Sequence, residues 1–157
     1  MRFDRPISPL PTGQNSTAAT GTNGVPLGGI GTGCVEILPD GRLTNSSTTN
    51  NYHRNDRIEF MPGSFLAIAA SAGGKSAARF LQTRTTLPAG RTGSALLLRD
   101  GEIEYSGAYP AAHLTYPCKD LPVRVSLVAH GTVVPEEMTL SSLPAAVFKF
   151  TVENPSR

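Results

Sequence analysis

Charged residues are scarce in this 157-residue chain, where Asp, Glu, Lys and Arg make up 17% of the sequence against about 25% in a typical globular protein. The 14 basic and 12 acidic residues leave a net charge of only +2. A protein that binds nucleic acid or an anionic membrane surface needs a concentrated basic patch, and these charges are scattered. No apolar run approaches the roughly 18 residues that a membrane-spanning helix requires. We therefore expect neither a nucleic-acid partner nor a membrane span.

Cysteine and histidine are also rare. The two cysteines, Cys34 and Cys118, are too few for the disulfide framework of a small secreted domain. The three histidines, His53, His113 and His130, lie far apart and form no i, i+4 pair, and the chain has no Cys-x-x-Cys motif. A zinc site is built from ligands at such spacings. We expect no metal and no cofactor, and we interpret both cysteines as small buried side chains.

The N-terminal segment lacks the features of a secretion signal. Asp4 and Pro6 interrupt the stretch in which a signal peptide has a continuous apolar region. This indicates a cytoplasmic protein. Residues 1–24 are rich in Pro, Ser, Thr and Gly and show no periodicity, which is typical of a flexible leader.

Glycine and proline, in contrast, are abundant. The 16 Gly and 13 Pro are 29 of the 157 residues, about 18% where about 12% is usual, so turns must be frequent. Between the turn signals lie short apolar runs that predict hairpins. Three are predicted: residues 33–38 with 42–45 around Pro39-Asp40-Gly41, residues 65–70 with 77–81 around Gly73-Gly74, and residues 94–98 with 102–106 around Asp100-Gly101. In the last hairpin Ile103 and Tyr105 should face the core, and Glu102 and Glu104 should face water.

Two later segments alternate at period two, as half-buried strands do. One face of residues 123–130 holds Val123, Val125, Leu127 and Ala129, and one face of residues 145–152 holds Ala146, Phe148, Phe150 and Val152. No segment shows a helical stripe that could link parallel strands. The sequence therefore predicts an all-β fold, an antiparallel β-sandwich over residues 25–157.

A glycine-rich loop is the first candidate site. Gly28, Gly29, Gly31 and Gly33 stand within six positions, but no helix signal or Lys-Ser/Thr pair follows them, so a phosphate-binding loop is disfavoured. The four glycines instead indicate a tight turn or a close approach to another surface. We predict that this loop faces another domain.

A polar loop is the second candidate site. It spans residues 46–56 and contains Asn50, Asn51, Tyr52 and Arg54, which together offer hydrogen bonds and a stacking ring suited to sugar hydroxyls. An ordinary surface loop is the alternative interpretation. Glycoside hydrolysis itself needs two carboxyl groups that flank one bond. Glu102 and Glu104 are close enough in sequence for that, but they lie on the face assigned to water, so the sequence predicts no catalytic pair.

Four blocks of the sequence, in order, resemble the N-terminal domain of glycoside hydrolase family 116, the family of the non-lysosomal glucosylceramidase, or bile acid β-glucosidase. The likeness runs from about residue 24 to 155. The blocks are Gly24 to Gly33 with Val35-Glu36 and Pro39-Asp40-Gly41-Arg42, then Tyr105 to Pro110, Leu121 to Leu127 and Ser142 to Phe148. One departure is that Leu43-Thr44-Asn45-Ser46 stands where many relatives carry aromatic residues.

The resemblance implies a β-sandwich that precedes a larger α-helical barrel, which holds both carboxylates of a retaining mechanism. Because this chain has no such barrel and ends about halfway through the usual sandwich, we expect an incomplete sandwich with no catalytic residue and no activity of its own. Its partner would be the catalytic domain of the same protein, and only the full-length enzyme would bind a β-glucoside or glucosylceramide substrate. The alternative hypothesis is a free-standing β-sandwich that binds carbohydrate or protein without catalysis.

Overall fold

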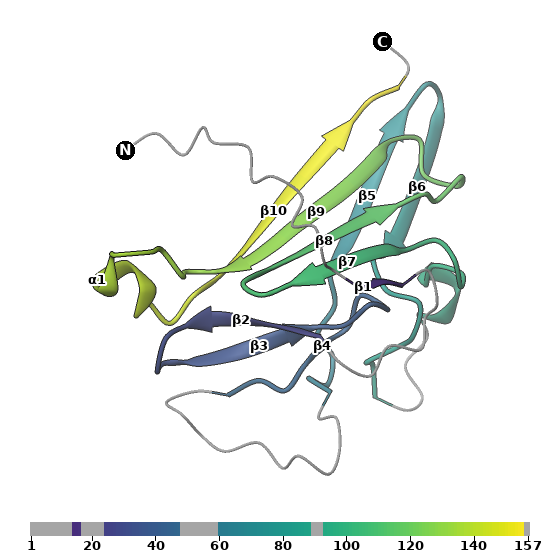
Figure 1. The fold of residues 1–157 in the computed structure, drawn as a ribbon. Coiled ribbons are helices and arrows are strands. Elements are labelled where there is room, and N and C mark those ends of the chain that lie inside the picture. Colours follow the sequence, from purple (N-terminus) through teal and green to yellow (C-terminus); the bar gives the residue numbers. More distant parts are fainter. Residues whose placement is uncertain (1–13, 17–23, 48–59, 89–92, 156–157) are drawn as a thin grey trace.

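The computed structural model describes residues 14–16, 24–47, 60–88 and 93–155. Its largest unit is an antiparallel sheet of five strands in the order β1-β7-β8-β9-β10 (Figure 1). The strands are β1 (Gln14–Ser16), β7 (Glu104–Ala108), β8 (Ala111–Tyr116), β9 (Arg124–Gly131) and β10 (Ala146–Glu153). Every pairing between neighbours in this sheet is antiparallel.

Two smaller antiparallel sheets complete the fold. One has the order β2-β3-β4, and the other is the hairpin β5-β6. The strands are β2 (Val25–Gly29), β3 (Gly33–Ile37), β4 (Leu43–Thr44), β5 (Ala67–Ala72) and β6 (Lys75–Phe80). Strand β2 packs against β8, β9 and β10, so the three-stranded sheet covers part of one face of the large sheet. The all-β, antiparallel prediction is confirmed.

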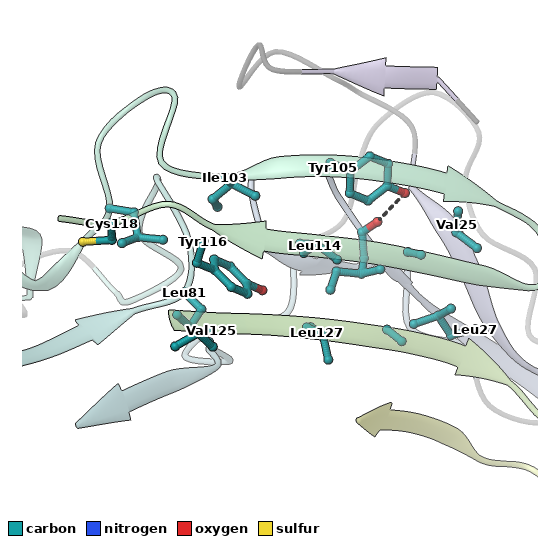
Figure 2. Close-up of a cluster of buried hydrophobic side chains, with 14 of the residues drawn as sticks. Val25, Leu27, Leu81, Ile103, Tyr105, Leu114, Tyr116, Cys118, Val125 and Leu127 are labelled. Atoms are coloured by element: carbon teal, nitrogen blue, oxygen red, sulfur yellow. Dashed lines mark hydrogen bonds between the residues drawn. The ribbon is translucent and has the colours of Figure 1, made fainter. Parts of the chain in front are cut away.

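The core lies between the five-stranded sheet and the three-stranded sheet. Most of its buried side chains come from alternate positions of facing strands, because successive residues of a strand point to opposite faces. Leu81, Leu98 and Leu121 join them from the connecting segments. Figure 2 shows Leu114 of β8 and Leu127 of β9 facing Val25 and Leu27 of β2. Burial of each large aliphatic side chain stabilises the fold by roughly 1.5–3 kcal/mol. The predicted inward positions Val125, Leu127 and Ala129 are all buried.

Two of the three predicted hairpins are confirmed, and the third is wrong. Strands β3 and β4 pair around the Asp40-Gly41 turn, and β5 and β6 pair around Gly73-Gly74, whose φ angles of 57° and 75° require glycine-like freedom. Residues 94–98, however, do not pair with 102–106. Ser94–Leu96 is instead a short 3-10 helix, η1, and β7 pairs with β8, a strand that the sequence analysis did not predict.

The third hairpin fails because residues 97–98 bind a different partner. Leu97 forms a parallel bridge with Phe80, and the Leu98 N–H donates to the Gln82 carbonyl oxygen at 3.0 Å. The turn itself is present, since the Glu102 N–H donates to the Arg99 carbonyl oxygen at 3.0 Å. Local turn chemistry was therefore interpreted correctly, and only the pairing beyond it was not. Ile103 and Tyr105 are buried and Glu104 is exposed, as predicted, whereas Glu102 is half-buried.

The predicted leader, residues 1–24, contains one described element, the strand β1, which pairs with residues 105–107 of β7.

At the other end of the chain, the inner face of β10 continues the inner face of β9. Phe148 lies opposite Ala129, Phe150 opposite Leu127 and Val152 opposite Val125. Phe148 packs on the core, but Phe150 is 41% and Val152 53% exposed. The predicted face is thus correct, and its C-terminal half lies uncovered by the described residues.

Two core tyrosines have opposite hydrogen-bonding situations. The Tyr105 hydroxyl donates to the Ile37 carbonyl oxygen at 3.4 Å (Figure 2), whereas the buried Tyr116 hydroxyl has no partner among the described residues. Burial raises the pKa of Tyr105 to about 12 and that of Tyr116 well above its ordinary value. Both hydroxyl groups are therefore protonated at neutral pH, and only that of Tyr105 has a hydrogen-bond partner among the described residues.

The two tyrosines make a matched pair of phenylalanine substitutions. Tyr116→Phe is expected to raise the melting temperature by about 2–4 °C, because a buried, unsatisfied hydroxyl costs about 1 kcal/mol or more. Tyr105→Phe should lower the melting temperature, because it removes a hydrogen bond and leaves the ring volume unchanged. Thermal unfolding followed by circular dichroism measures both. Shifts in the same direction for the two variants would contradict this assignment.

Candidate functional site

The glycine-rich loop is the turn of the β2–β3 hairpin. Gly29 and Gly33 are the last paired residues, and Ile30, Gly31 and Thr32 connect them. Gly31 and Gly33 have φ angles of 73° and 105°, which other residues rarely adopt. A strand follows the loop, so its backbone N–H groups are not arranged at a helix N-terminus as in a phosphate site. The expectation that no helix follows this loop is confirmed.

Two of these glycines lie against other parts of the same chain. A Cβ on Gly29 would overlap the Leu143 carbonyl oxygen, and the next residue, Ile30, donates its N–H to the Ser141 carbonyl oxygen at 2.7 Å. Where β2 crosses β9, a Cβ on Gly131 would lie 2.5 Å from the Gly28 carbonyl oxygen. The absent side chains therefore let β2 approach both β9 and the segment before β10.

The end of the sandwich that carries the β2–β3 turn exposes apolar side chains on backbone that is held by hydrogen bonds. The four-residue helix α1 (Met138–Ser141) and the β2–β3 turn lie at the same end of the molecule (Figure 1). Ile30, Met138 and Leu143 are exposed there. The Ser141 hydroxyl exchanges hydrogen bonds of 2.9 Å with the backbone N–H and carbonyl of Val134, which holds the helix in place. We call Ile30, Gly31, Met138 and Leu143 the apolar end.

A shallow pocket of about 180 Å³ lies beside this end. Gly28, Gly33 and Cys34 line it together with Ser47 and Pro144. The Cys34 N–H donates to the Ser47 hydroxyl at 3.0 Å, and the Ser47 N–H donates to the Cys34 carbonyl oxygen at 2.8 Å, so the segment after β4 is tied to β3. The two cysteines are free; Cys118 is buried, as expected, and Cys34 is half-buried.

The predicted polar loop contributes nothing to this description, because Asn50, Asn51, Tyr52 and Arg54 lie outside the described residues. The structure brings Gly28, Gly29, Gly31 and Gly33 together in one hairpin, and the sugar-binding role of the polar loop stays a prediction.

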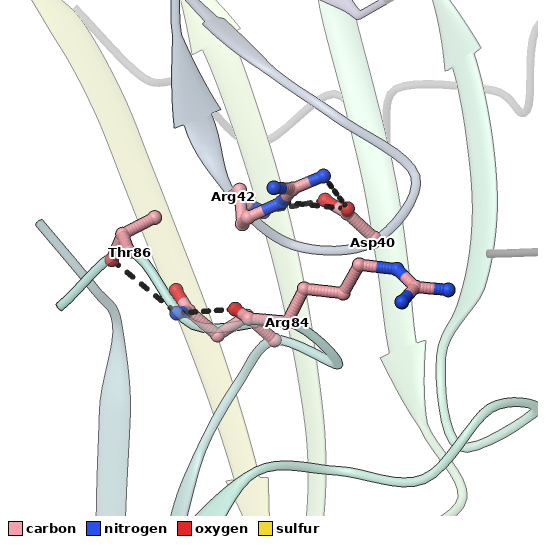
Figure 3. Close-up of polar contacts among 5 residues, drawn as sticks. Asp40, Arg42, Arg84 and Thr86 are labelled. Atoms are coloured by element: carbon pink, nitrogen blue, oxygen red, sulfur yellow. Dashed lines mark hydrogen bonds and ion pairs between the residues drawn. The ribbon is translucent and has the colours of Figure 1, made fainter. Parts of the chain in front are cut away.

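A second polar feature was missed by the sequence analysis, which treated Pro39-Asp40-Gly41 only as a turn. Asp40 is 1% exposed. Its carboxylate accepts hydrogen bonds from the Arg42 Nε at 2.7 Å and the Arg42 backbone N–H at 3.1 Å, and an Arg42 Nη atom lies 2.5 Å from it (Figure 3). The Arg42 guanidinium also lies 3.9 Å from the centre of the Phe60 ring. The Asp-Gly-Arg spacing is the signal that could have indicated this ion pair.

The buried turn docks on the segment that follows β6. The Asp40 carbonyl oxygen accepts the Thr83 N–H at 3.0 Å, and a Cβ on Gly41, whose φ is 84°, would overlap the Leu81 carbonyl oxygen. Next to this contact, the buried Gln82 side chain donates to the Arg84 carbonyl oxygen at 2.7 Å (Figure 3). Asp40 therefore fastens the β3–β4 hairpin to the rest of the fold, and its carboxylate is committed to Arg42.

Three further carboxylates, those of Glu102, Glu104 and Asp120, are engaged in structural interactions too. Glu104 accepts a hydrogen bond from the Thr115 hydroxyl at 2.8 Å, and Glu102 accepts one from the Arg99 N–H at 2.8 Å. The hydrogen bond from Arg79 at 2.8 Å lowers the pKa of Asp120, and nearby Arg99 acts in the same direction. A glycosidase acid needs a raised pKa, so Asp120 is unsuited to that role.

Within the described ranges, no cluster of three or more His, Cys, Asp or Glu side chains that could hold a metal ion occurs. Of the helices in residues 14–16, 24–47, 60–88 and 93–155, none is long and apolar enough to cross a membrane.

Comparison with known proteins complements this geometry. No curated protein matches the chain. A family model described as "beta-glucosidase 2, glycosyl-hydrolase family 116 N-term" matches residues 24–157. This match begins at the first residue before β2 and includes both sides of the apolar end. The chain belongs to glycoside hydrolase family 116, and residues 24–157 match the N-terminal domain of that family.

Proposed function

We propose that this domain is a non-catalytic β-sandwich that supports an α-helical catalytic domain of the same enzyme, which hydrolyses β-glucosides with retention of configuration. The observation that carries the proposal is the match to the N-terminal domain of a β-glucosidase family. The engagement of Asp40, Glu104 and Asp120 in contacts within the sandwich supports it further, because a retaining glycosidase needs two free carboxyl groups about 5–5.5 Å apart.

The apolar end is the surface that we assign to the catalytic domain. Ile30, Met138 and Leu143 expose apolar area on backbone that hydrogen bonds hold in place, and such patches mark interaction sites. Gly31, at the tip of the turn, has no atom within 4 Å of the position of a Cβ, so another surface can approach its backbone closely. Within the glycine loop, the predicted contact with another domain is therefore assigned to Gly31. Gly28 and Gly29 are already packed against other segments of the same chain.

The isolated chain is expected to hydrolyse no aryl β-glucoside. Enzymes lower reaction barriers by roughly 8–23 kcal/mol, and the proposed source of that lowering, a pair of carboxylates, would lie in the catalytic domain. A chromogenic β-glucoside in excess over purified chain measures the rate, with buffer alone as the blank. Turnover that persists through purification and is lost in Glu104→Gln would overturn the proposal.

One structural feature favours the alternative, a free-standing sandwich that binds carbohydrate. A shallow pocket of about 310 Å³ lies where β8 and β10 end and β9 begins, and Arg124, Ser126, Thr151 and Glu153 contribute polar groups to it. Hydroxyl, guanidinium and carboxylate groups can all hydrogen-bond to sugar hydroxyls.

The reading frame downstream of Arg157 distinguishes the two functions. A frame that encodes a helical domain supports the role within a glycosidase. A stop codon at that point, together with glycan binding that Arg124→Ala weakens, would establish the binding module instead.

A further inference from the structure

Strand β1 lies outside the part of the chain that matches the family, yet it belongs to the sheet of that domain. The family match begins at residue 24, whereas β1 comprises residues 14–16. These three residues pair antiparallel with residues 105–107 of β7 (Figure 1). Further strands of a larger sandwich can extend this sheet beyond β10, but the position beside β7 is already taken by β1. The chain therefore adds a strand to its own domain from outside that domain.

The stretch of β7 beside β1 carries a contact between the two main sheets. Ser16 lies opposite Tyr105, and Gln14 lies opposite Gly107. The Tyr105 hydroxyl donates to the Ile37 carbonyl oxygen of β3 at 3.4 Å (Figure 2), and the Tyr105 ring fills the space in which a Cβ on Gly107 would lie. A shift of β7 would therefore disturb a contact that joins the five-stranded sheet to the three-stranded sheet.

On its other side, β7 pairs with β8 along its whole length, from Glu104 to Ala108. The N–H and C=O groups of such a strand point alternately toward its partner and away from it. Another strand can bind the groups that point away from β8, and β1 covers the central part of this row. The edge that β1 itself presents is only three residues long and includes Asn15, a residue type that is uncommon in strands. Very short edge strands are one device by which natural sheets avoid pairing with other molecules.

We propose that β1 is a strap that closes the β7 edge, and that the strand it excludes is β7 of a second copy of this chain. Two uncovered β7 edges fit each other, since an antiparallel pair about Ser106 places Glu104 opposite Ala108 and Tyr105 opposite Gly107, and no like charges meet. The short segment 17–24 links the strap to β2, so the strap has a high effective concentration at the edge and a second molecule must compete with it. This role goes beyond the proposed function and does not depend on where a catalytic domain docks.

Two prolines test the strap. Adjacent residues of a strand direct their N–H groups to opposite sides, so one proline of Asn15→Pro/Ser16→Pro must remove an N–H that faces β7. Hydrogen exchange of the β7 amides that point away from β8 should become at least tenfold faster, and the self-association constant of the intact chain should rise at least tenfold over that of the parent. Asn15→Ala/Ser16→Ala keeps both N–H groups, so it is the matched control and should behave as the parent. Hydrogen exchange by NMR and sedimentation equilibrium measure the two quantities.

A charge placed on the edge tests which strand is excluded. In the proline variant, Ala108→Glu would lie opposite Glu104 of the second copy and should return self-association to the parental level. Unchanged exchange in the proline variant, or an alanine control that behaves like it, would overturn the strap. Faster exchange without stronger association would overturn its closing role, and association that survives Ala108→Glu would overturn β7 of a second copy as the excluded strand.

A disulfide tests the same strap without weakening it. Asn15 lies directly opposite Ser106, so Asn15→Cys/Ser106→Cys should form a disulfide within one chain under mild oxidation, and oxidation should slow exchange of the same β7 amides. Asn15→Cys/His113→Cys is the control, because His113 lies opposite Ser106 on β8 and is therefore one strand further from β1. The parent chain, with its own Cys34 and Cys118, gives the background. No disulfide in the first pair, or equal cross-linking in both pairs, would overturn the proposal.

Discussion

Replacing Arg42 by methionine is expected to lower the free energy of unfolding by about 3 kcal/mol, because it leaves the Asp40 carboxylate buried without its counter-charge. The Asp40 side chain is only 2% exposed and that of Arg42 16%, so water can replace little of the lost interaction. A domain of this size is stable by only about 5–15 kcal/mol. The variant should therefore unfold at much lower urea concentration or temperature than the parent chain.

The control for this experiment is the double variant Arg42→Met/Asp40→Asn. Asparagine keeps the side-chain oxygen that accepts the Arg42 backbone N–H at 3.1 Å, but it carries no charge. Replacement of both members of a buried ion pair by neutral groups is often close to neutral for stability. The double variant should recover most of the lost stability. If it unfolds as early as Arg42→Met, the contact of the guanidinium with the Phe60 ring, and not the buried charge, is what stabilises this turn.

The second large effect is expected at Gly29. Gly29→Val should lower the free energy of unfolding of the isolated chain by about 2–4 kcal/mol, since its side chain would overlap the Leu143 carbonyl oxygen and push β2 away from the segment between α1 and β10. The Ile30–Ser141 hydrogen bond of 2.7 Å should be lost with it, at a cost of about 1 kcal/mol. Urea unfolding followed by circular dichroism gives the free energies.

Gly31→Asn is the matched control two residues away. Its φ of 73° suits asparagine better than most residues, and no atom lies within 4 Å of the new Cβ. The stability of the isolated chain should hardly change, whereas docking of a catalytic domain on the apolar end would be weakened. An unchanged unfolding curve for Gly29→Val would mean that β2 does not need its close approach to Leu143, and both glycines would then belong to the proposed docking surface.

The fold class and the faces of several strands could be predicted from local sequence patterns. Alternation placed Val125, Leu127 and Ala129 toward the core, and all three are buried. Glycine pairs located the turn at residues 73–74, where positive φ angles are needed. These features are local, since a two-residue period and the conformational freedom of glycine are properties of a few neighbouring residues. They are therefore readable without knowledge of the rest of the chain.

The pairing of the strands, and the burial of individual polar and glycine residues, depend on the complete fold. Residues 94–98 carry hairpin signals, but Leu98 binds Gln82 instead, and β7 pairs with β8. Asp40 has the sequence context of an exposed turn, and its burial follows from docking on residues 81–83. The need for glycine at position 29 comes from Leu143, more than a hundred residues away in sequence. Each of these outcomes depends on long-range contacts, whose loop-closure entropy and packing gains no local pattern records.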